Sequence, residues 1–279
     1  ATPPAKSTVR KAAAKNAASK RTVAKKAPAT KRGKSRGIDL DDSNLPTLSS
    51  PGRVVYPDAG TTKQPLWPYY HPPPPQLREE TGGRLISIVR CPDGIGGQHF
   101  FQKHVKHGFG DEVKPFKLTE NDGDEATYFY VDSLEGLMSL VQMNTIEIHP
   151  WGSRIETLEQ PDRIVFDLDP DPSIDWPTIR AAARDVRDRL LEVGIESFPK
   201  LSGGKGVHVV APLKPKADWE AVRRFCDAFA DTMARQSPER YVATMSKAQR
   251  KGRIFIDWVR SGRGATSVAS WSLRARKGA

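Results

Sequence analysis

The sequence predicts an α/β (α+β) domain in which helices flank a central sheet. Amphipathic helices alternate with short apolar strands along the chain, an order typical of that fold class. Two of the strands carry acidic residues, Asp167 and Asp169 on one and Asp257 on the other. A glycine-rich segment with a lysine, Ser202 to His208, lies between two further strands. We therefore expect an acidic site on the sheet with a glycine loop close to it.

The elements follow from apolar periodicity and from turn residues. The helix with the clearest spacing has apolar residues at Ile179, Val186 and Leu190, and Gly194 follows it. We expect helices at 134–143, 176–193 and 219–233. Short apolar runs predict strands at 84–91, 127–131, 145–149, 163–169, 197–201, 207–212, 253–259 and 267–273.

Charge is distributed unevenly over the 279 residues, whose formal net charge is +11. Residues 1–37 contain twelve of the 44 basic residues and no acidic ones, which leaves 32 basic against 33 acidic side chains in the remainder. Residues 1–37 consist mainly of Ala, Lys and Pro without apolar periodicity, so we expect a disordered basic linker that is solvated or contacts DNA without specificity. Residues 38–279 then form the domain. Because the chain begins with Ala1, we expect a processed chain or a piece of a longer protein.

Several classes of protein are excluded by composition. The sequence has no run of about eighteen apolar residues that could span a membrane, and its polar start lacks a signal peptide. Two cysteines, Cys91 and Cys226, supply neither a disulfide framework nor a zinc site. A cytoplasmic protein without a membrane partner is indicated.

Asp167 and Asp169 point to a metal site. Alternate residues of a strand project to one face, so both carboxylates lie on the same side of an apolar strand. Charge placed there is costly, and a divalent cation such as Mn²⁺ or Mg²⁺ can offset the cost. A calcium loop does not fit, because Pro172 stands at the sixth position and Thr178 at the twelfth. A turn after the strand would explain Asp169 but not Asp167.

The segment from Ser202 to His208 favours contact with phosphate. It is not a Walker loop, since Pro199 replaces the first glycine and Gly206 follows Lys205. It is not a dinucleotide fingerprint, since a strand follows it. Glycines let backbone N–H groups approach phosphate oxygens, and Lys205 adds a charge. A simple hairpin turn remains the alternative.

Other candidate residues lie around these motifs. Arg250, Arg274 and Arg276 flank the Asp257 strand and could neutralise phosphate charge, or be solvated surface residues. Phe100 and Phe101 precede Lys103 by a few residues, as in a base-stacking platform. Because neighbouring strand residues face opposite sides, we expect only one of the two aromatic rings to be exposed. His149 ends an apolar strand, where a buried structural histidine is the alternative.

Together these segments resemble one family. The order D-x-D, S-G-G-K-G-x-H, I-D-W and S-L-R-A-R is similar to the archaeo-eukaryotic primase superfamily. Within it, the chain resembles the polymerase domain of bacterial ATP-dependent DNA ligase D over residues 48–276. Further matching blocks are R-V-V-Y-P at 53–57, G-T-T-K at 60–63, V-R-C-P-D-G at 89–94, F-F-Q-K at 100–103 and I-E-I-H at 146–149.

The resemblance implies a primase-polymerase fold with a mixed central sheet that carries the catalytic aspartates. It implies a template-directed nucleotidyltransferase that adds ribo- or deoxyribonucleotides at DNA gaps and ends in non-homologous end joining. By the resemblance, Asp167, Asp169 and Asp257 bind two Mn²⁺ or Mg²⁺ ions. The incoming NTP or dNTP is contacted by His149, Ser202, Lys205, His208, Arg250, Arg274 and Arg276. DNA is contacted by Arg53 and Lys63 at a 5′-phosphate, by Phe100 or Phe101 at the template, and by Lys103.

The resemblance also implies partners and a location. These are gapped or broken DNA with a 5′-phosphate, the end-binding protein Ku and a ligase module, in the cytoplasm of a bacterium and associated with its nucleoid. Two departures from the family pattern stand out. The run Pro72 to Pro75 interrupts a region that is usually helical, and the chain stops at Ala279, where the family continues. The competing hypotheses are a catalytically impaired module that binds 5′-phosphorylated DNA ends and a metal-dependent phosphodiesterase.

Overall fold

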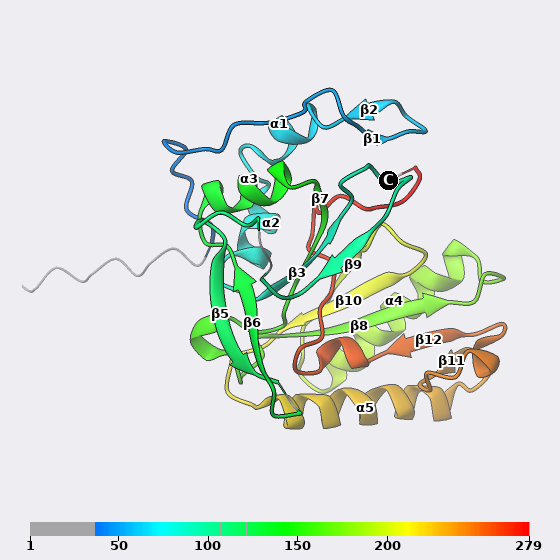
Figure 1. The fold of residues 1–279 in the computed structure, drawn as a ribbon. Coiled ribbons are helices and arrows are strands. Elements are labelled where there is room, and N and C mark those ends of the chain that lie inside the picture. The colour runs from blue at the N-terminus through cyan, green and yellow to red at the C-terminus, as the bar shows by residue number, and fades with distance from the viewer. Residues whose placement is uncertain (1–36, 106–107, 121, 279) are drawn as a thin grey trace, which may run out of the picture. The chain divides into compact units, whose positions relative to one another are not determined.

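The computed structural model describes residues 37–105, 108–120 and 122–278. The basic linker expected at 1–37 thus lies, apart from Gly37, outside the described residues. The central element is a five-stranded sheet with the strand order β11-β12-β8-β10-β9 (Figure 1). β11 and β12 are parallel and the other neighbours are antiparallel, so the sheet is mixed as expected. Its strands are β8 (Arg163–Pro170), β9 (Phe198–Leu201), β10 (Val207–Pro212), β11 (Tyr241–Val242) and β12 (Ile254–Asp257).

One face of this sheet is covered by two long helices, α4 (Trp176–Glu192) and α5 (Trp219–Gln236) (Figure 1). Aspartates cap both, since Asp175 and Asp218 accept hydrogen bonds from the backbone N–H groups of Thr178 and Ala221. The core under the helices contains alternate strand residues, among them Ile164, Phe166, Leu168, Val209 and Ile256. Strand alternation therefore turns the residues between them toward the opposite face.

A second group of elements carries its own core. A three-stranded sheet has the order β4-β3-β7, and β5 and β6 form a separate hairpin. Its apolar centre includes Ile86, Ile88, Leu137, Leu140 and Ile148. The elements are β1 (Val54–Tyr56), β2 (Thr61–Thr62), α1 (Leu66–Tyr70), α2 (Pro75–Thr81), β3 (Ile86–Arg90), β4 (Phe100–Gln102), β5 (Lys114–Thr119), β6 (Glu125–Tyr130), α3 (Leu134–Gln142) and β7 (Thr145–Pro150). Three short 3₁₀ turns are η1 (Ile155–Thr157), η2 (Lys247–Arg250) and η3 (Val259–Ser261).

The proline run separates two short helices. α1 ends at Tyr70 and α2 begins at Pro75, whose missing N–H is tolerated at a first helical position. Tyr70 and Leu77 are nevertheless buried in the second core. The departure from the family pattern is therefore accommodated by a break in the helical region. Among the described helices, none is long and apolar enough to cross a bilayer.

The strand expected at 267–273 is wrong. Residues 267–276, which we call the C-terminal segment, contain no strand. Trp271 has a φ of 62°, which breaks an extended backbone. The backbone N–H groups of Ser270, Leu273 and Ala275 donate to the side chains of Glu80, Tyr70 and Glu147. The N–H of Ala269 donates to the backbone oxygen of Ile148 on β7. This mixture of side-chain and backbone partners is one that apolar alternation cannot reveal.

Candidate active site

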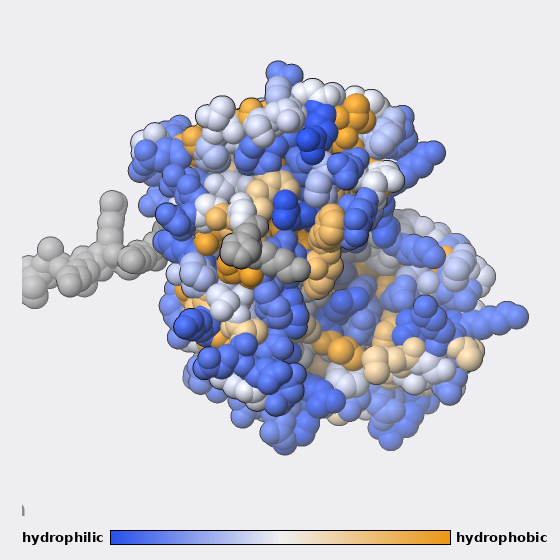
Figure 2. Space-filling model, in the orientation of Figure 1, coloured by the Kyte–Doolittle hydropathy of each residue, from blue (hydrophilic) through white to orange (hydrophobic). Residues whose placement is uncertain are grey.

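The predicted aspartates lie in a row across the centre of the five-stranded sheet. Asp167 on β8 is the direct cross-strand partner of Asp257 on β12 and of His208 on β10. Asp169 lies two residues further along β8, on the same face. All four face away from α4 and α5. In the space-filling view the molecule is hollowed between the part built on β3 and β7 and the part that carries this sheet (Figure 2).

Cationic side chains accompany each carboxylate. Nε of Arg260 lies 3.3 Å from Oδ2 of Asp257 and 3.7 Å from Oδ2 of Asp167. Nη1 of Arg250 lies 3.2 Å from Oδ2 of Asp169. Burial raises the pKa of Asp167 to about 6, against the effect of Arg260 and with a further contribution from Asp257. Burial also raises the pKa of Asp257. The fold therefore concentrates negative charge where its desolvation is costly.

His208 is held neutral beside Asp167. Burial, followed by the charge of Lys200, lowers the pKa of His208 to about 3. Its Nε2 lies 3.6 Å from Oδ1 of Asp167, and its Nδ1 has no hydrogen-bond partner among the described residues. A buried imidazole nitrogen without a partner is available to a ligand.

The donor set fits a hard divalent cation. Three carboxylates on one sheet face are the oxygen ligands that Mg²⁺ and Mn²⁺ prefer, and a cation would relieve the burial cost at Asp167 and Asp257. Within the described residues, however, no group of three His, Cys, Asp or Glu side chains is drawn together as a ready-made metal site. Arg260 and Arg250 occupy the carboxylates instead.

The glycine loop is the turn of a hairpin. Residues 202–206 join β9 to β10, which are antiparallel, so the hairpin alternative is correct and compatible with a phosphate-binding loop. A Cβ on Gly206 would lie 1.9 Å from the backbone oxygen of Leu168, the residue between Asp167 and Asp169. Only glycine permits this approach, which fixes the loop against the strand of carboxylates. Lys205 is exposed in the loop.

The C-terminal segment brings the two expected arginines to this loop. Nη1 of Arg274 donates to the backbone oxygen of Ser202 at 2.7 Å, and Nη1 of Arg276 donates to that of Gly203 at 3.3 Å. Nε of Arg274 also lies 3.2 Å from Oε1 of Glu147 on β7. Arg274 thus connects the loop to the second group of elements.

Glu147 also binds His149, a partnership that the sequence analysis missed. Their side chains meet at 2.7 Å, and the ring of Phe101 lies edge-on to His149 with centroids 6.2 Å apart. Burial opposes ionisation of Glu147, but His149, the N–H of Ala275 and Arg274 outweigh it, so the pKa is lowered. The spacing i, i+2 in I-E-I-H was the available signal, since it places both side chains on one face.

Arg53 and Lys63 converge on a separate cavity of about 160 Å³. The Lys63 ammonium is buried and donates to the backbone oxygens of Ser49 and Gln142 at 3.1 and 2.5 Å. Burial and then the charge of Arg53 lower the pKa of Lys63. Arg90, which the sequence analysis did not single out, also lines this cavity.

The exposure of the two phenylalanines expected at the template differs from the prediction. Phe100 and Phe101 are 42% and 62% exposed, so the expectation that only one ring is exposed is wrong. β4 is a three-residue edge strand, and neither of its faces is fully covered at these positions. Lys103 turns to Glu120, with its Nζ 2.9 Å from Oε1, and so lies apart from the carboxylate row.

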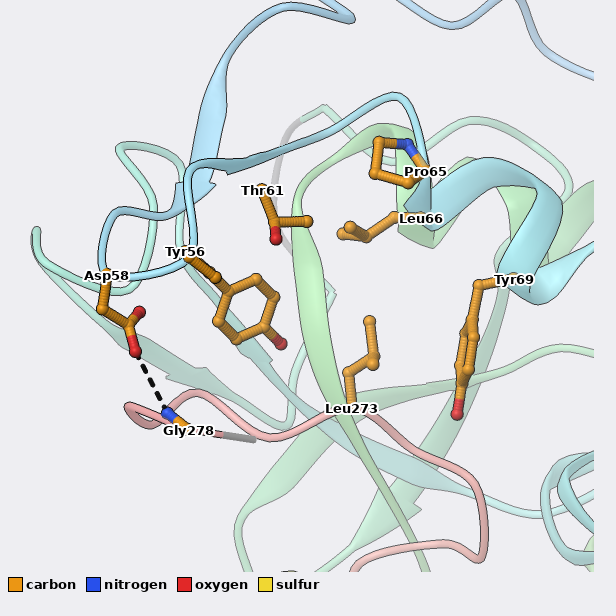
Figure 3. A pocket seen from close by; sticks show the side chains of 9 residues that line it. Tyr56, Asp58, Thr61, Pro65, Leu66, Tyr69, Leu273 and Gly278 are labelled. Carbon is orange, nitrogen blue, oxygen red and sulfur yellow. Dashed lines mark hydrogen bonds between the residues drawn. The ribbon is translucent and has the colours of Figure 1, made fainter.

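A second cavity, of about 210 Å³, lies beneath the C-terminal segment. Figure 3 shows Leu273 pointing into it between the rings of Tyr56 and Tyr69. Tyr56 donates to the backbone oxygen of Arg274 at 3.1 Å, and Tyr69 donates to that of Trp271 at 3.0 Å. These tyrosines hold the segment that carries Arg274 and Arg276.

Three carboxylates on a mixed sheet, beside a glycine hairpin of the same sheet, fit the chemistry of a nucleotidyltransferase. The sequence model of the LigD primase-polymerase domain matches residues 62–279. The chain therefore belongs to the LigD primase-polymerase family, and the expected fold and enzyme class are confirmed.

Proteins of similar sequence and structure support the same family. The chain is 37% identical over 231 residues to the multifunctional non-homologous end joining protein LigD of Pseudomonas aeruginosa, covering 83% of this chain and 27% of that protein. It is 30% identical over 238 residues to the LigD DNA repair protein of Mycobacterium tuberculosis, covering 82% and 31%. The polymerase domain of M. tuberculosis ligase D, solved in complex with DNA, matches with a TM-score of 0.76 and 29% identity over 83% of each chain. The chain thus spans only about a third, or less, of the length of these two curated relatives.

Proposed function

We propose that this domain adds ribo- or deoxyribonucleotides to a DNA primer end at gaps and breaks that carry a 5′-phosphate, as a step of non-homologous end joining. The observation that carries the proposal is the cross-strand pair of Asp167 and Asp257 beside the glycine hairpin. The family membership supports the polymerase chemistry, and the DNA in the M. tuberculosis neighbour supports a DNA substrate.

The carboxylates would hold two divalent cations, Mn²⁺ or Mg²⁺. Asp167 and Asp257 face each other across two paired strands, and Asp169 lies beside them on β8. When bound there, such ions would lower the pKa of the primer 3′-hydroxyl and stabilise the charge that develops on the leaving pyrophosphate. The rigid sheet keeps the three side chains in place during the reaction, which limits the cost of reorganisation.

The incoming nucleotide would lie between the hairpin and the C-terminal segment. Arg274, fixed between Ser202 and Glu147, offers its remaining N–H groups to phosphate oxygens. Lys205 is free to approach the triphosphate from the exposed loop. His208, neutral at pH 7, can hydrogen-bond a ligand through Nδ1 without adding charge. The proposed nucleotide site is completed by four further residues, Ser202, Arg276, Arg250 and His149.

The DNA would occupy the exposed surfaces beside this site. Phe100 and Phe101 are both exposed, so one of the two rings would stack on a template base, with Lys103 in the same strand region. The cavity lined by Arg53, Lys63 and Arg90 would receive the 5′-phosphate on the far side of the gap, because its cationic lining attracts a dianion. The three N–H groups of Lys63 are bonded to Ser49 and Gln142, so Lys63 would act through its charge. A ligase module and Ku are the proposed protein partners, and the bacterial nucleoid is the proposed location.

Primer extension on gapped DNA with Mn²⁺ and ribonucleotides tests the proposal. Asp257→Ala should lower the rate roughly a thousandfold or more while leaving DNA affinity nearly unchanged, because it removes transition-state stabilisation and no duplex contact. Asp231→Ala is the matched control, since Asp231 pairs with Arg235 on the surface of α5. Extension by Asp257→Ala at the wild-type rate would contradict the assignment. Tight binding to 5′-phosphorylated ends without extension by wild type would favour the end-binding module.

A further inference from the structure

Arg260 lies at the centre of the carboxylate row. It belongs to η3, the turn that follows β12. Its Nε contacts one oxygen of each of two facing carboxylates, Oδ2 of Asp257 at 3.3 Å and Oδ2 of Asp167 at 3.7 Å. The guanidinium therefore bridges the pair.

The backbone beside Arg260 is fixed to the same strand as Asp167. The buried hydroxyl of Ser261 donates to the backbone oxygen of Val165 at 3.1 Å and accepts from its N–H at 3.0 Å. These two reciprocal bonds tie η3 to β8. The side chain of Arg260, in contrast, is 46% exposed. A fixed backbone with a partly solvated head group lets the guanidinium leave the carboxylates without any change in the fold.

The pattern of occupied oxygens shows what competes with the guanidinium. Oδ1 of Asp257 accepts the backbone N–H of Val259 at 3.0 Å. Oδ1 of Asp167 faces His208. The Oδ2 oxygens of both carboxylates are left for Arg260. A cation bridging the two carboxylates through these oxygens would need the position that the guanidinium now holds, since like charges cannot share it.

We propose that Arg260 is an exchangeable counter-cation of the metal site. Without a metal ion it neutralises Asp167 and Asp257, which stabilises the folded protein. A divalent cation that bridges the pair displaces it, so Arg260 lowers the apparent affinity for that cation and sets the concentration at which the site fills. This inference rests on the proposed metal site.

Mn²⁺ binding, followed by the electron paramagnetic resonance signal of free Mn²⁺, tests the proposal without any substrate. Arg260→Ala should bind Mn²⁺ about tenfold more tightly than wild type, because the ion no longer displaces a charge-assisted contact. Without Mn²⁺ its melting temperature should be lower, and the rise on adding Mn²⁺ should be larger. Arg260→Gln should behave similarly, and Arg260→Lys, which keeps the charge, should stay close to wild type. Arg224→Ala is the control, since Arg224 pairs with Glu220 on the exposed surface of α5.

Each outcome separates the hypotheses. Unchanged Mn²⁺ affinity in both Arg260→Ala and Arg260→Gln, with lower stability at every Mn²⁺ concentration, would make Arg260 a purely structural residue and overturn the proposal. Weaker binding would overturn it as well, since Arg260 would then support the ion. Equal binding by wild type and Asp257→Ala would instead remove the metal site itself, whatever Arg260 does.

Discussion

Replacing Gly206 by alanine should damage both stability and catalysis. The added Cβ would lie 1.9 Å from the backbone oxygen of Leu168, about 1.5 Å closer than an ordinary contact. The obstacle is backbone in the middle of β8, so the hairpin must move. Val207 and Leu168 are a register pair at the end of the β10–β8 ladder, and a displacement of this size breaks the pairing there.

The expected loss follows from these contacts. Overpacking costs about 1–3 kcal/mol, and one or two broken ladder hydrogen bonds add about 1 kcal/mol each, so the free energy of unfolding should fall by about 2–5 kcal/mol. Urea denaturation measures that loss, and primer extension on gapped DNA at low temperature measures the displaced nucleotide site. Gly52→Ala is the control, because a Cβ there meets no atom within 4 Å. A Gly206→Ala protein within about 1 kcal/mol of wild type and fully active would refute the tight approach of the loop.

Three further predictions concern single side chains. Lys205→Ala should raise the KM for the nucleotide about tenfold to a hundredfold without changing affinity for gapped DNA, because one exposed charge-assisted contact is lost. Fluorescence anisotropy measures the DNA affinity, and an equal loss there would mark Lys205 as a DNA contact. Wild type should bind gapped DNA with a 5′-phosphate about 2–4 kcal/mol more tightly than gapped DNA with a 5′-hydroxyl, and Lys63→Met should abolish this preference. If wild type shows no such preference, the 5′-phosphate site is refuted. Glu80→Gln should lower the melting temperature at pH 7 and flatten its fall in acid. Burial opposes ionisation of Glu80, but Lys200, Ser270 and Arg163 outweigh it and lower its pKa. Its stabilising effect is thus complete above the ordinary carboxyl pKa and is lost as pH falls through the lower folded value; identical melting profiles from pH 7 to pH 3 would contradict this.

Periodicity predicted the long elements well. The helices expected at 134–143, 176–193 and 219–233 are α3, α4 and α5, with ends that differ by three residues at most. Apolar alternation identified every strand of the five-stranded sheet except the two-residue β11. Short elements such as β1, β2 and α1 were missed because an element of two to five residues is too short to show a hydrophobic period. No strand forms at 267–273 because Ser270 and Leu273 donate their backbone N–H groups to side chains from distant parts of the sequence, and Ala269 makes a single bond to the backbone of β7.

The candidate site was predictable only in part, because much of it depends on contacts between distant parts of the sequence. Alternation alone placed Asp167 and Asp169 on one face. That Asp257 and His208 are cross-strand partners of Asp167 depends on strand order and register, which one strand's sequence does not contain. Glu147 and Arg90 stand in matching blocks but were not singled out, because the contact of Glu147 with Arg274 and the place of Arg90 beside Arg53 join distant parts of the chain.

The C-terminal segment has a consequence for biosynthesis. During translation, residues 267–276 emerge after every other part of the described site, and they bring Arg274 to Ser202 and Glu147. Before that moment the five-stranded sheet already has its core residues, whereas the second core still lacks Ala269, Leu273 and Ala275. The nascent chain therefore has its row of acidic side chains before it has Arg274 and Arg276, the arginines of the proposed nucleotide site.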